Sequence, residues 1–324
     1  MPAKGHAMQL FALDATRDFG ARVAGELGVS LASHEEREFE DGEHKARPLI
    51  DVQGEHAFVI QSLHGGPDQS GADKLCRLLF FAGALRDHGA ARVTAVLPYL
   101  AYGRKDRQTK PGDPVTNRYI AQLIEAIGID AVVTLEAHNV AALQNAFRIP
   151  TVHLDGGAVF AERTLQLVGD APAVVASPDP GGVKRAQLFR ELLEARSGRS
   201  FGAAYLEKRR SGGVVSGDLL AGDVQGATVL LIDDLVSTGG TLLRAARTCL
   251  QQGATRVVAF AAHGLFNHGA DAALTDGAIE RVFVSDSVPP FRLGRDARAR
   301  IDVVSAAPHF AQAIRRLAGP SPAA

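Results

Sequence analysis

Two adjacent carboxylates, Asp233 and Asp234, follow an apolar run at residues 229–232, and a short polar segment comes soon after them. That segment combines hydroxyl side chains with two glycines: Ser237, Thr238, Gly239, Gly240 and Thr241. Carboxylates bind sugar hydroxyls or a hydrated divalent cation through their oxygens. A glycine-rich turn at the start of a helix binds phosphate, because its backbone N–H groups and the helix dipole favour an anion. The stretch therefore predicts a phosphate site beside paired carboxylates; a polar turn capped by Thr241 is the alternative.

A parallel sheet is needed to position these residues, because ligands of α/β proteins bind beyond the carboxyl ends of parallel strands. Short apolar runs alternate with amphipathic segments along the chain. We predict two strand–helix–strand units, at residues 57–60, 72–88 and 92–97 and at residues 229–232, 241–252 and 256–260. Neighbouring strand residues point to opposite faces, so we expect that Asp233 and Asp234 do not compete for one position.

The two halves of the chain also resemble each other in sequence. Residues 89–96 (GAARVTAV) match residues 253–260 (GATRVVAF) at an offset of 253 − 89 = 164 residues. Gly-Ala before a strand is common where helices end, so one short match can arise by chance. Together with the repeated order of elements it favours an internal duplication. We expect two domains, at residues 1–149 and 150–324, which is an ordinary number for 324 residues.

Composition narrows the class of protein. Hydrophobic residues make up 46% and charged residues 22%, as in soluble globular proteins. A formal net charge of −1 gives no reason to expect a nucleic acid or an anionic membrane as partner. No apolar run approaches the length that spans a membrane, and the first residues lack a signal-peptide pattern. We therefore expect a cytoplasmic protein.

Five further segments occur along the chain in an order that is expected for one protein family. They are EFEDGE (38–43), PYLAYGRKDRQ (98–108), DPVT (113–116), SPDPGGVKRA (177–186) and KRR (208–210). The segment at 229–241 resembles the phosphoribosyl-diphosphate binding motif of the phosphoribosyltransferase fold. With the five others, over nearly the whole chain, the sequence resembles the ribose-phosphate diphosphokinase (phosphoribosyl diphosphate synthetase) family. The resemblance implies an α/β fold of two tandem phosphoribosyltransferase-like domains, each a mainly parallel sheet flanked by helices.

The same resemblance implies an activity: transfer of the diphosphoryl group of ATP to the C1 hydroxyl of ribose 5-phosphate, giving 5-phosphoribosyl 1-diphosphate and AMP. It assigns nucleotide binding and assembly to the first domain and ribose 5-phosphate to the second. In the second domain, residues 237–241 would hold the 5-phosphate, and Asp233 and Asp234 the ribose hydroxyls. ATP would be bound by an aromatic ring, carboxylates and guanidinium groups: Phe39, Asp41, Glu43, Arg104 and Arg107. The family also binds Mg²⁺, here through His138 and Asp179.

Lys208 and Arg210 are the residues that the resemblance places in catalysis. They precede a glycine-rich stretch at residues 211–217, which we expect to be a mobile loop that closes over the substrates. A solvated basic cluster is the alternative. In the family the loop matching Phe39–Glu43 serves the neighbouring subunit's site, which implies a homo-oligomer, a hexamer built from dimers.

Three positions depart from the family's usual residues, namely Lys105, Glu136 and Asn139. The first half also has a counterpart of the phosphate loop at residues 64–71, but without paired aspartates. We expect no second sugar site there. Two other functions stay open: a phosphoribosyltransferase that consumes the activated sugar, and a non-catalytic regulatory paralogue of the synthetase.

Overall fold

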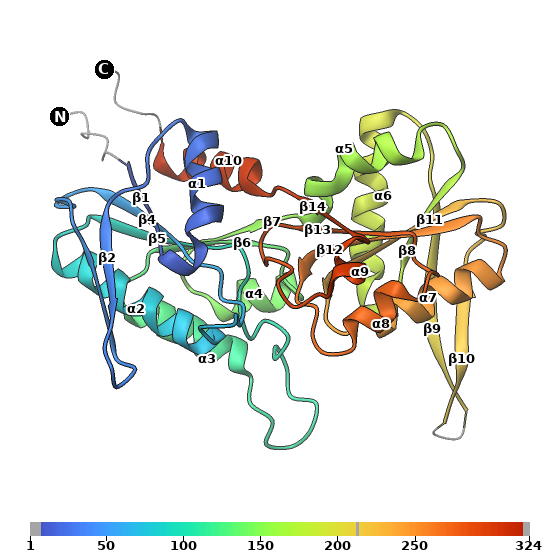
Figure 1. Cartoon of the computed structure of the whole chain (residues 1–324), viewed down its shortest axis with the longest axis horizontal. Coiled ribbons are helices and arrows are strands. Elements are labelled where there is room, and N and C mark those ends of the chain that lie inside the picture. The colour runs from blue at the N-terminus through green and yellow to red at the C-terminus, as the bar shows by residue number, and fades with distance from the viewer. Residues whose placement is uncertain (1–7, 212–213, 320–324) are drawn as a thin grey trace. The chain divides into compact units, whose positions relative to one another are not determined.

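The computed structural model describes residues 8–211 and 214–319, without the side chains of residues 208–218. Two compact units make up the chain (Figure 1). Unit 1 comprises Met1–Leu154 and Ala306–Ala324, and unit 2 comprises Asp155–Ser305. Each unit contains a mainly parallel sheet with helices on both faces, as the sequence predicts.

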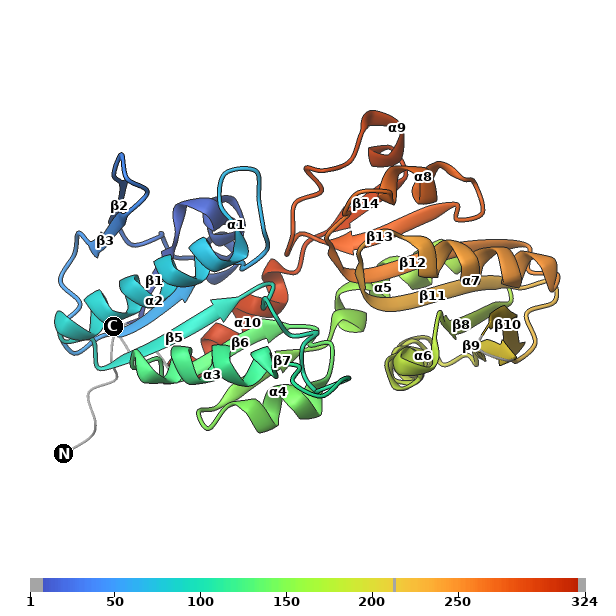
Figure 2. The same ribbon diagram turned by 90° about the horizontal axis from the view of Figure 1, so that it is seen from below.

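The sheet of unit 1 has five parallel strands in the order β1-β4-β5-β6-β7. β4 and β6 are buried at every residue, which explains why their sequences are apolar throughout and do not alternate. A separate antiparallel hairpin, β2–β3, extends from this unit (Figure 2). The strands are β1 (Met8–Ala12), β2 (His34–Glu38), β3 (His44–Pro48), β4 (His56–Ile60), β5 (Arg92–Leu97), β6 (Ala131–Leu135) and β7 (Thr151–Leu154).

Helices α1 and α10 lie on one face of this sheet, and α2, α3 and α4 lie on the other (Figure 1). The second face carries an apolar cluster in which Phe81 and Leu78 of α2 are fully buried. The helices are η1 (Asp14–Thr16), α1 (Arg17–Leu27), α2 (Gly71–Asp87), α3 (Thr116–Ala126), α4 (Val140–Ala146) and α10 (Ala307–Ala318).

The unit boundary differs from the predicted division at residues 149 and 150. β7 belongs to unit 1 because it pairs in parallel with β6 at the edge of the first sheet. α10 returns to unit 1 from the end of the chain, because its buried Phe310 packs edge-on against Phe19 of α1. A linear division cannot represent this arrangement, in which the C-terminal helix completes the N-terminal unit.

The sheet of unit 2 has seven strands in the order β10-β9-β8-β11-β12-β13-β14. All neighbours run in parallel except β9 and β10, which pair antiparallel at one edge. The strands are β8 (Ala173–Ser177), β9 (Gly202–Ser211), β10 (Val214–Ala221), β11 (Thr228–Val236), β12 (Arg256–Gly264), β13 (Arg281–Ser285) and β14 (Ile301–Val304).

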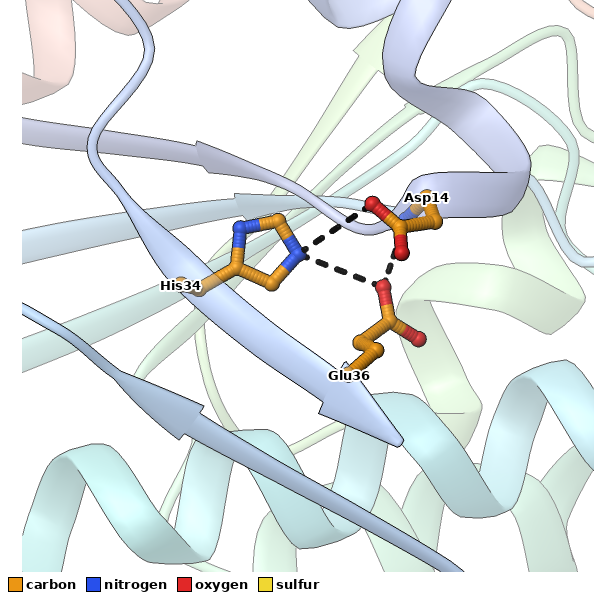
Figure 3. A group of neighbouring side chains, drawn as sticks. All are labelled: Asp14, His34 and Glu36. Carbon is orange, nitrogen blue, oxygen red and sulfur yellow. Dashed lines mark hydrogen bonds and ion pairs between the residues drawn. The ribbon is translucent and has the colours of Figure 1, made fainter. Parts of the chain in front are cut away.

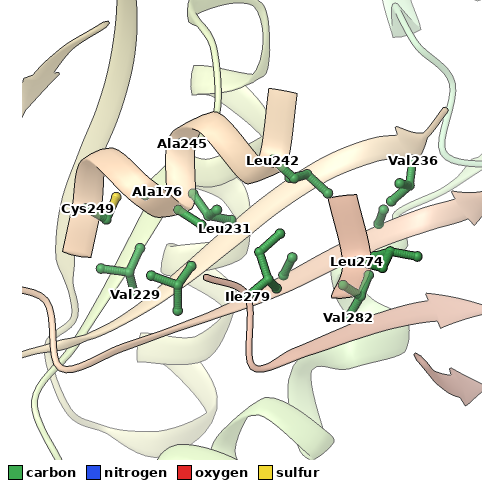
Figure 4. Packing of buried hydrophobic residues seen from close by; sticks show 14 of the residues in the cluster. Ala176, Val229, Leu231, Val236, Leu242, Ala245, Cys249, Leu274, Ile279 and Val282 are labelled. Carbon is green, nitrogen blue, oxygen red and sulfur yellow. The ribbon is translucent and has the colours of Figure 1, made fainter. Parts of the chain in front are cut away.

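Helices α5 and α6 cover one face of this sheet, and α7, α8 and α9 cover the other (Figure 1). Leu242, Ala245 and Cys249 of α7 pack onto Val229 and Leu231 of β11 in a continuous apolar layer (Figure 4). The helices are α5 (Gly156–Val168), η2 (Pro180–Gly182), α6 (Val183–Ser197), α7 (Gly240–Gln251), α8 (Ala270–Thr275) and α9 (Arg295–Arg298). Within residues 8–211 and 214–319, none of the helices has the length and apolar character that a membrane crossing requires.

The segment after Arg210, which the sequence predicts as a mobile loop, belongs in part to two paired strands. β9 ends at Ser211 and β10 begins at Val214, with pairs from Ser211–Val214 to Tyr205–Ala221 and an irregularity between Val215 and Gly217. Gly212 and Gly213 lie outside the described residues.

A repeated corner supports the internal duplication. Asp-Val-Gln-Gly occurs at residues 51–54 and again at residues 223–226. In each copy the first aspartate accepts a hydrogen bond from the glutamine N–H, and the valine is buried. The final glycine N–H then donates to the carbonyl of a left-handed glycine, Gly89 at 2.8 Å and Gly253 at 2.9 Å. These two glycines begin the matching octets, so the similarity extends to backbone hydrogen bonds.

We predict that Phe310→Ala destabilises unit 1 by about 3–5 kcal/mol, the usual cost of truncating a buried phenylalanine. Urea denaturation followed by circular dichroism would measure the loss. Phe291→Ala is the control, because 40% of that side chain is exposed and its truncation should change stability little. Equal denaturation midpoints for Phe310→Ala and the unmodified protein would contradict the assignment of α10 to the core of unit 1.

Candidate active site

The carboxyl edge of the second sheet gathers the predicted sugar-binding residues. β11 runs to Val236, three residues beyond Asp233, and pairs with β12 up to Gly264. Its pairing with β8 on the other side ends at Leu231. Asp233 and Asp234 therefore belong to the strand itself, at the part of β11 that extends past the end of β8. The predicted strand was too short because a carboxylate pair inside a parallel strand is unusual in an otherwise apolar segment.

The segment 237–241 forms the turn from β11 into α7. Gly239 adopts φ +76° and is the residue just before α7. A Cβ at this position would lie 2.8 Å from the Cβ of Ala273, so only glycine fits. Ser237 is held from the other side, because Asn267 donates from Nδ2 to its Oγ at 3.0 Å and from its backbone N–H to the Ser237 carbonyl at 2.8 Å. Thr238 and Gly240 are exposed. The predicted turn and helix start are confirmed.

The N-terminus of α7 differs from that of α2 in a way that bears on anion binding. No side chain among the described residues caps α7. In α2, by contrast, Ser70 accepts from the Asp73 N–H at 3.1 Å, and Asp73 accepts from the Ser70 N–H at 2.8 Å. This reciprocal pair occupies the donors that would hold a phosphate. The sequence at residues 64–71 therefore forms a self-capped turn, whereas the start of α7 offers its N–H groups to a ligand.

Arg185 contacts both carboxylates of the site. It lies in the first turn of α6, and its Nη1 is 3.4 Å from Asp233 Oδ1, while its Nη2 is 4.0 Å from Asp234 Oδ1. Both aspartates are largely buried, with 16% and 7% of their side chains exposed. One guanidinium on the neighbouring helix reaches both of them.

Burial governs the proton affinity of this pair. Desolvation of the Asp233 carboxyl, together with the nearby Asp234 carboxylate, raises the pKa of Asp233 to about 8, although Arg185 favours the ionised form. Near neutral pH the pair therefore tends to keep one proton. Such a pair both donates and accepts hydrogen bonds, which matches the hydroxyl groups of a sugar.

Asp179 stands at the end of β8, the strand next to β11. Its Oδ1 accepts hydrogen bonds from the N–H groups of Gly181 at 2.9 Å and Gly182 at 3.2 Å. Its own carbonyl accepts from Ser177 Oγ at 2.6 Å. The carboxylate is thus fixed at the same edge as Asp233, which suits an oxygen ligand of a hard cation.

His138 lies in unit 1, between β6 and α4, and is exposed. The next residue, Asn139, caps α4 by accepting from the Ala142 N–H at 3.1 Å. Its Nδ2 donates to Asp106 at 2.9 Å, which ties the His138 segment to the loop at residues 98–115. Asn139, one of the three departures, therefore has a structural role in this chain. Glu136, another departure, is buried and takes φ +39° just after β6.

The predicted ATP-binding residues all belong to unit 1, in two exposed segments. Phe39, Asp41 and Glu43 form the loop of the β2–β3 hairpin, and Arg104 and Arg107 lie in the loop after β5. The hairpin lies along α2, whereas the second loop follows the carboxyl end of β5 (Figure 1). Lys105, the third departure, is exposed in that loop. The structure places the two segments in one unit.

Lys208 and Arg210 lie on β9, where their backbones pair with Asp218 and Val215 of β10. Their side chains are outside the described part of the structure. The site residue that sequence reasoning missed is Arg185, which stands inside the segment at 177–186 without an assigned role. Its signal was its position, one turn into a helix that begins at the carboxyl edge of the sheet.

We predict that Asp233→Asn stabilises the protein while it impairs the site. Between about pH 4 and pH 8 the folded chain keeps a proton that the unfolded chain releases, so folding stability falls as pH rises through this window. Asparagine removes that penalty, and a gain of 1 kcal/mol corresponds to roughly 2–4 °C for a unit of this size. Thermal melts should show the gain above pH 8 and none below pH 4.

Asp276→Asn is the control for this experiment. Hydrogen bonding from Arg247 lowers the pKa of Asp276, so its loss should never raise the melting temperature. A pH-independent change in Asp233→Asn would refute the burial argument.

Comparisons with known proteins cover almost the whole chain. A model of the N-terminal domain of ribose phosphate pyrophosphokinase matches residues 8–128, and a model of the phosphoribosyl synthetase-associated domain matches residues 218–321. The chain is 35% identical over 314 residues to a ribose-phosphate pyrophosphokinase of Caldanaerobacter subterraneus, covering 96% of this chain and 95% of that protein. A ribose-phosphate pyrophosphokinase of Wolinella succinogenes is 33% identical over 310 residues, with 95% of each chain covered.

A solved structure extends the likeness to the fold. The crystal structure of phosphoribosylpyrophosphate synthetase from Mycobacterium smegmatis matches with a TM-score of 0.85 and 31% identity. The match covers 96% of this chain and 98% of that one, which confirms the predicted fold class of two tandem phosphoribosyltransferase-like domains. The sequence motifs, the site edge of unit 2 and these full-length relatives agree, and the chain belongs to the ribose-phosphate pyrophosphokinase family.

Proposed function

We propose that this enzyme transfers the diphosphoryl group of ATP to the C1 hydroxyl of ribose 5-phosphate, giving 5-phosphoribosyl 1-diphosphate and AMP. Family membership supports this reaction. The observation that carries it is the junction of β11 and α7, where a largely buried carboxylate pair is followed, after the turn at residues 237–239, by a helix start that no side chain of the described residues caps. A phosphorylated sugar has the matching chemistry, with hydroxyl groups at one end and an anion at the other.

Ribose 5-phosphate would lie along this junction. Its phosphate would take the N–H groups and hydroxyls of residues 237–241 at the start of α7. Its ring hydroxyls would meet Asp233 and Asp234, which can donate as well as accept while they share a proton. Arg185 would then orient the carboxylates from α6.

ATP would be held by unit 1. Phe39, which is 39% exposed, offers a ring face for the adenine, and Asp41 and Glu43 offer acceptors for its amino group and for ordered water. Arg104 and Arg107 would hold the phosphates, because guanidinium groups bind phosphate oxygens in a bidentate manner. We further propose that the hairpin loop completes the site of a neighbouring subunit, in a hexamer built from dimers.

Each of the two Mg²⁺ ligands that the family resemblance implies suits the ion within its own unit, because the Asp179 carboxylate is oriented and the His138 imidazole is exposed. The ion would neutralise charge on the phosphate oxygens. Lys208 and Arg210 would bring two cations to the transferring group while the C1 hydroxyl attacks the β-phosphorus and AMP leaves. Such a transfer needs alignment and charge stabilisation, with little covalent help from the protein.

Incubation of the purified chain with ATP, magnesium and ribose 5-phosphate tests the proposal, with products identified by mass spectrometry. We expect AMP and 5-phosphoribosyl 1-diphosphate in a one-to-one ratio. ADP as product would indicate a simple phosphotransferase. Consumption of 5-phosphoribosyl 1-diphosphate with a base, without ATP, would indicate a phosphoribosyltransferase. No turnover by the protein alone, with activity only alongside a second homologue, would indicate a regulatory paralogue.

We predict that Lys208→Ala lowers the turnover number about a hundred- to a thousand-fold while the Michaelis constants change little. A donor that acts on the transition state is typically worth roughly 3–4 kcal/mol, and its loss affects kcat more than binding. Arg209→Ala is the matched control, because it removes the same charge from the adjacent position. Steady-state kinetics with a thermal melt would decide; normal turnover in a folded Lys208→Ala variant would exclude the proposed role.

A further inference from the structure

The hairpin β2–β3 is held against unit 1 by a buried arginine of α2. Arg77 is 6% exposed, although arginine is rarely buried without acidic partners. Its Nη2 lies 2.6 Å from Glu38 Oε2, and its Nη1 lies 3.8 Å from Glu36 Oε2. Both glutamates belong to β2, two residues apart and therefore on one face of the strand. One side chain of α2 thus contacts the hairpin at two points.

A second group fixes the start of the same strand. His34 Nε2 lies 3.2 Å from Glu36 Oε1 and 3.8 Å from Asp14 Oδ1, and the Asp14 backbone N–H also donates to Glu36 Oε1 (Figure 3). The ligand atoms of these three residues all lie within 4.8 Å of one another, as in a metal site.

Hydrogen bonding explains this group better than metal binding does. A metal on His34 Nε2 would move the ring proton to Nδ1, which is buried and has no hydrogen-bond partner among the described residues. With the proton on Nε2, the imidazole instead donates to Glu36 and leaves Nδ1 bare. Arg77 supplies the positive charge that a cation would otherwise bring to Glu36.

Glu36 is ionised despite its burial. Burial of its carboxyl opposes ionisation, but the hydrogen bonds from His34 and the Asp14 N–H and the charge of Arg77 outweigh it, so the pKa of Glu36 lies below its ordinary value. The pair of Glu36 with Arg77 is therefore an ion pair at neutral pH. Only 6% and 7% of the two side chains are exposed, so water screens the pair little.

The loop at the tip of this hairpin is closed by backbone hydrogen bonds, so its position depends on the two strand ends. The Phe39 N–H donates to the Glu43 carbonyl at 2.8 Å, and the Gly42 N–H donates to the Phe39 carbonyl at 3.0 Å. Closed in this way, the loop takes its position from Glu38 before it and His44 after it. Glu38 pairs with Arg77, and His44 stacks on Phe80, also of α2, with ring centroids 5.3 Å apart.

We propose that Arg77 is a positioning residue for ATP binding, acting through Glu36 and Glu38 on the loop that presents Phe39, Asp41 and Glu43. This inference rests on the proposed function, in which that loop holds the nucleotide. Arg77 does not touch the nucleotide itself. It restricts the hairpin to one placement on α2, so that the loop loses less conformational entropy when the nucleotide binds.

Kinetics of three variants test the proposal. Glu38→Gln removes the ion pair between Arg77 and Glu38 at the base of the loop. Arg77 still balances the charge of the buried Glu36, so this variant should fold. We expect its KM for ATP to rise roughly three- to tenfold, as for a small misplacement of a binding group, with KM for ribose 5-phosphate and kcat nearly unchanged. Arg77→Gln should raise KM for ATP further, and Arg77→Lys should restore part of the loss. A KM for ATP unchanged in both Glu38→Gln and Arg77→Gln would overturn the proposal.

Arg47→Gln is the matched control. Arg47 Nε lies 2.6 Å from Glu35 Oε2, and this pair joins β3 to β2 within the hairpin, whereas the pair of Arg77 with Glu38 joins α2 to β2. This variant removes an ion pair of equal length without freeing the hairpin from α2. We expect its KM for ATP to equal that of the unmodified enzyme. An equal rise in Arg47→Gln would show that general weakening of the hairpin, and no specific role of Arg77, causes the effect.

A second readout does not depend on activity. The chain contains no tryptophan, so Phe39→Trp places a single fluorophore in the loop. In that background Arg77→Gln should raise the amplitude of the fast component of the anisotropy decay at the expense of the slow tumbling component, and Arg47→Gln should leave both amplitudes unchanged. Unchanged anisotropy in Arg77→Gln would overturn the proposal even in an active enzyme. Greater loop motion in a chain that makes no 5-phosphoribosyl 1-diphosphate would refute the proposed function and leave the anchoring role of Arg77 intact.

Discussion

Two carboxylates buried side by side near the end of β11 determine what the neighbouring strand and helix of unit 2 must provide. Burial of like charges is costly, and the cost appears as the raised proton affinity of Asp233. Arg185 of α6 offsets part of this cost through its positive charge. It can reach the carboxylates because β8 ends at Ser177 and η2 brings the start of α6 to the same edge of the sheet. Unit 2 thus gives up stability at this edge, as functional sites commonly do, to keep a polar pair ready for a ligand.

The two units share a sheet architecture but differ at the helix start where an anion site is expected. Their sheets share the Asp-Val-Gln-Gly corner and its hydrogen bonds to a left-handed glycine. They differ at the following helix start, where Ser70 and Asp73 cap α2 and where α7 has no side-chain cap among the described residues. We infer that this difference in capping leaves N–H groups for an anion at the start of α7 and occupies them at the start of α2.

The hairpin β2–β3 poses a different physical problem. A two-stranded ribbon outside the main sheet is at best marginally stable by itself, so its position depends on what attaches it. Much of the attachment here is polar: Arg77 of α2 meets two glutamates of β2, and His34 joins Glu36 to Asp14. Directional pairs of this kind fix orientation more closely than an apolar contact would. For the nucleotide contact that we propose for this loop, orientation matters more than strength of attachment.

The sequence by itself determined two strand–helix–strand units, the bounds of their two helices to within one residue, the turn at residues 237–241 and the family. These features depend on local patterns, namely apolar runs, glycines at helix ends and residues in a fixed order, which each segment carries alone. Tertiary structure decided what joins distant segments. It placed α10 on unit 1, because Phe310 packs against Phe19, and it extended β11 through its carboxylates, because β12 continues beside it. It also brought Arg185 to Asp233 and Arg77 to Glu38, since ion pairs between elements depend on packing that no spacing in the sequence encodes.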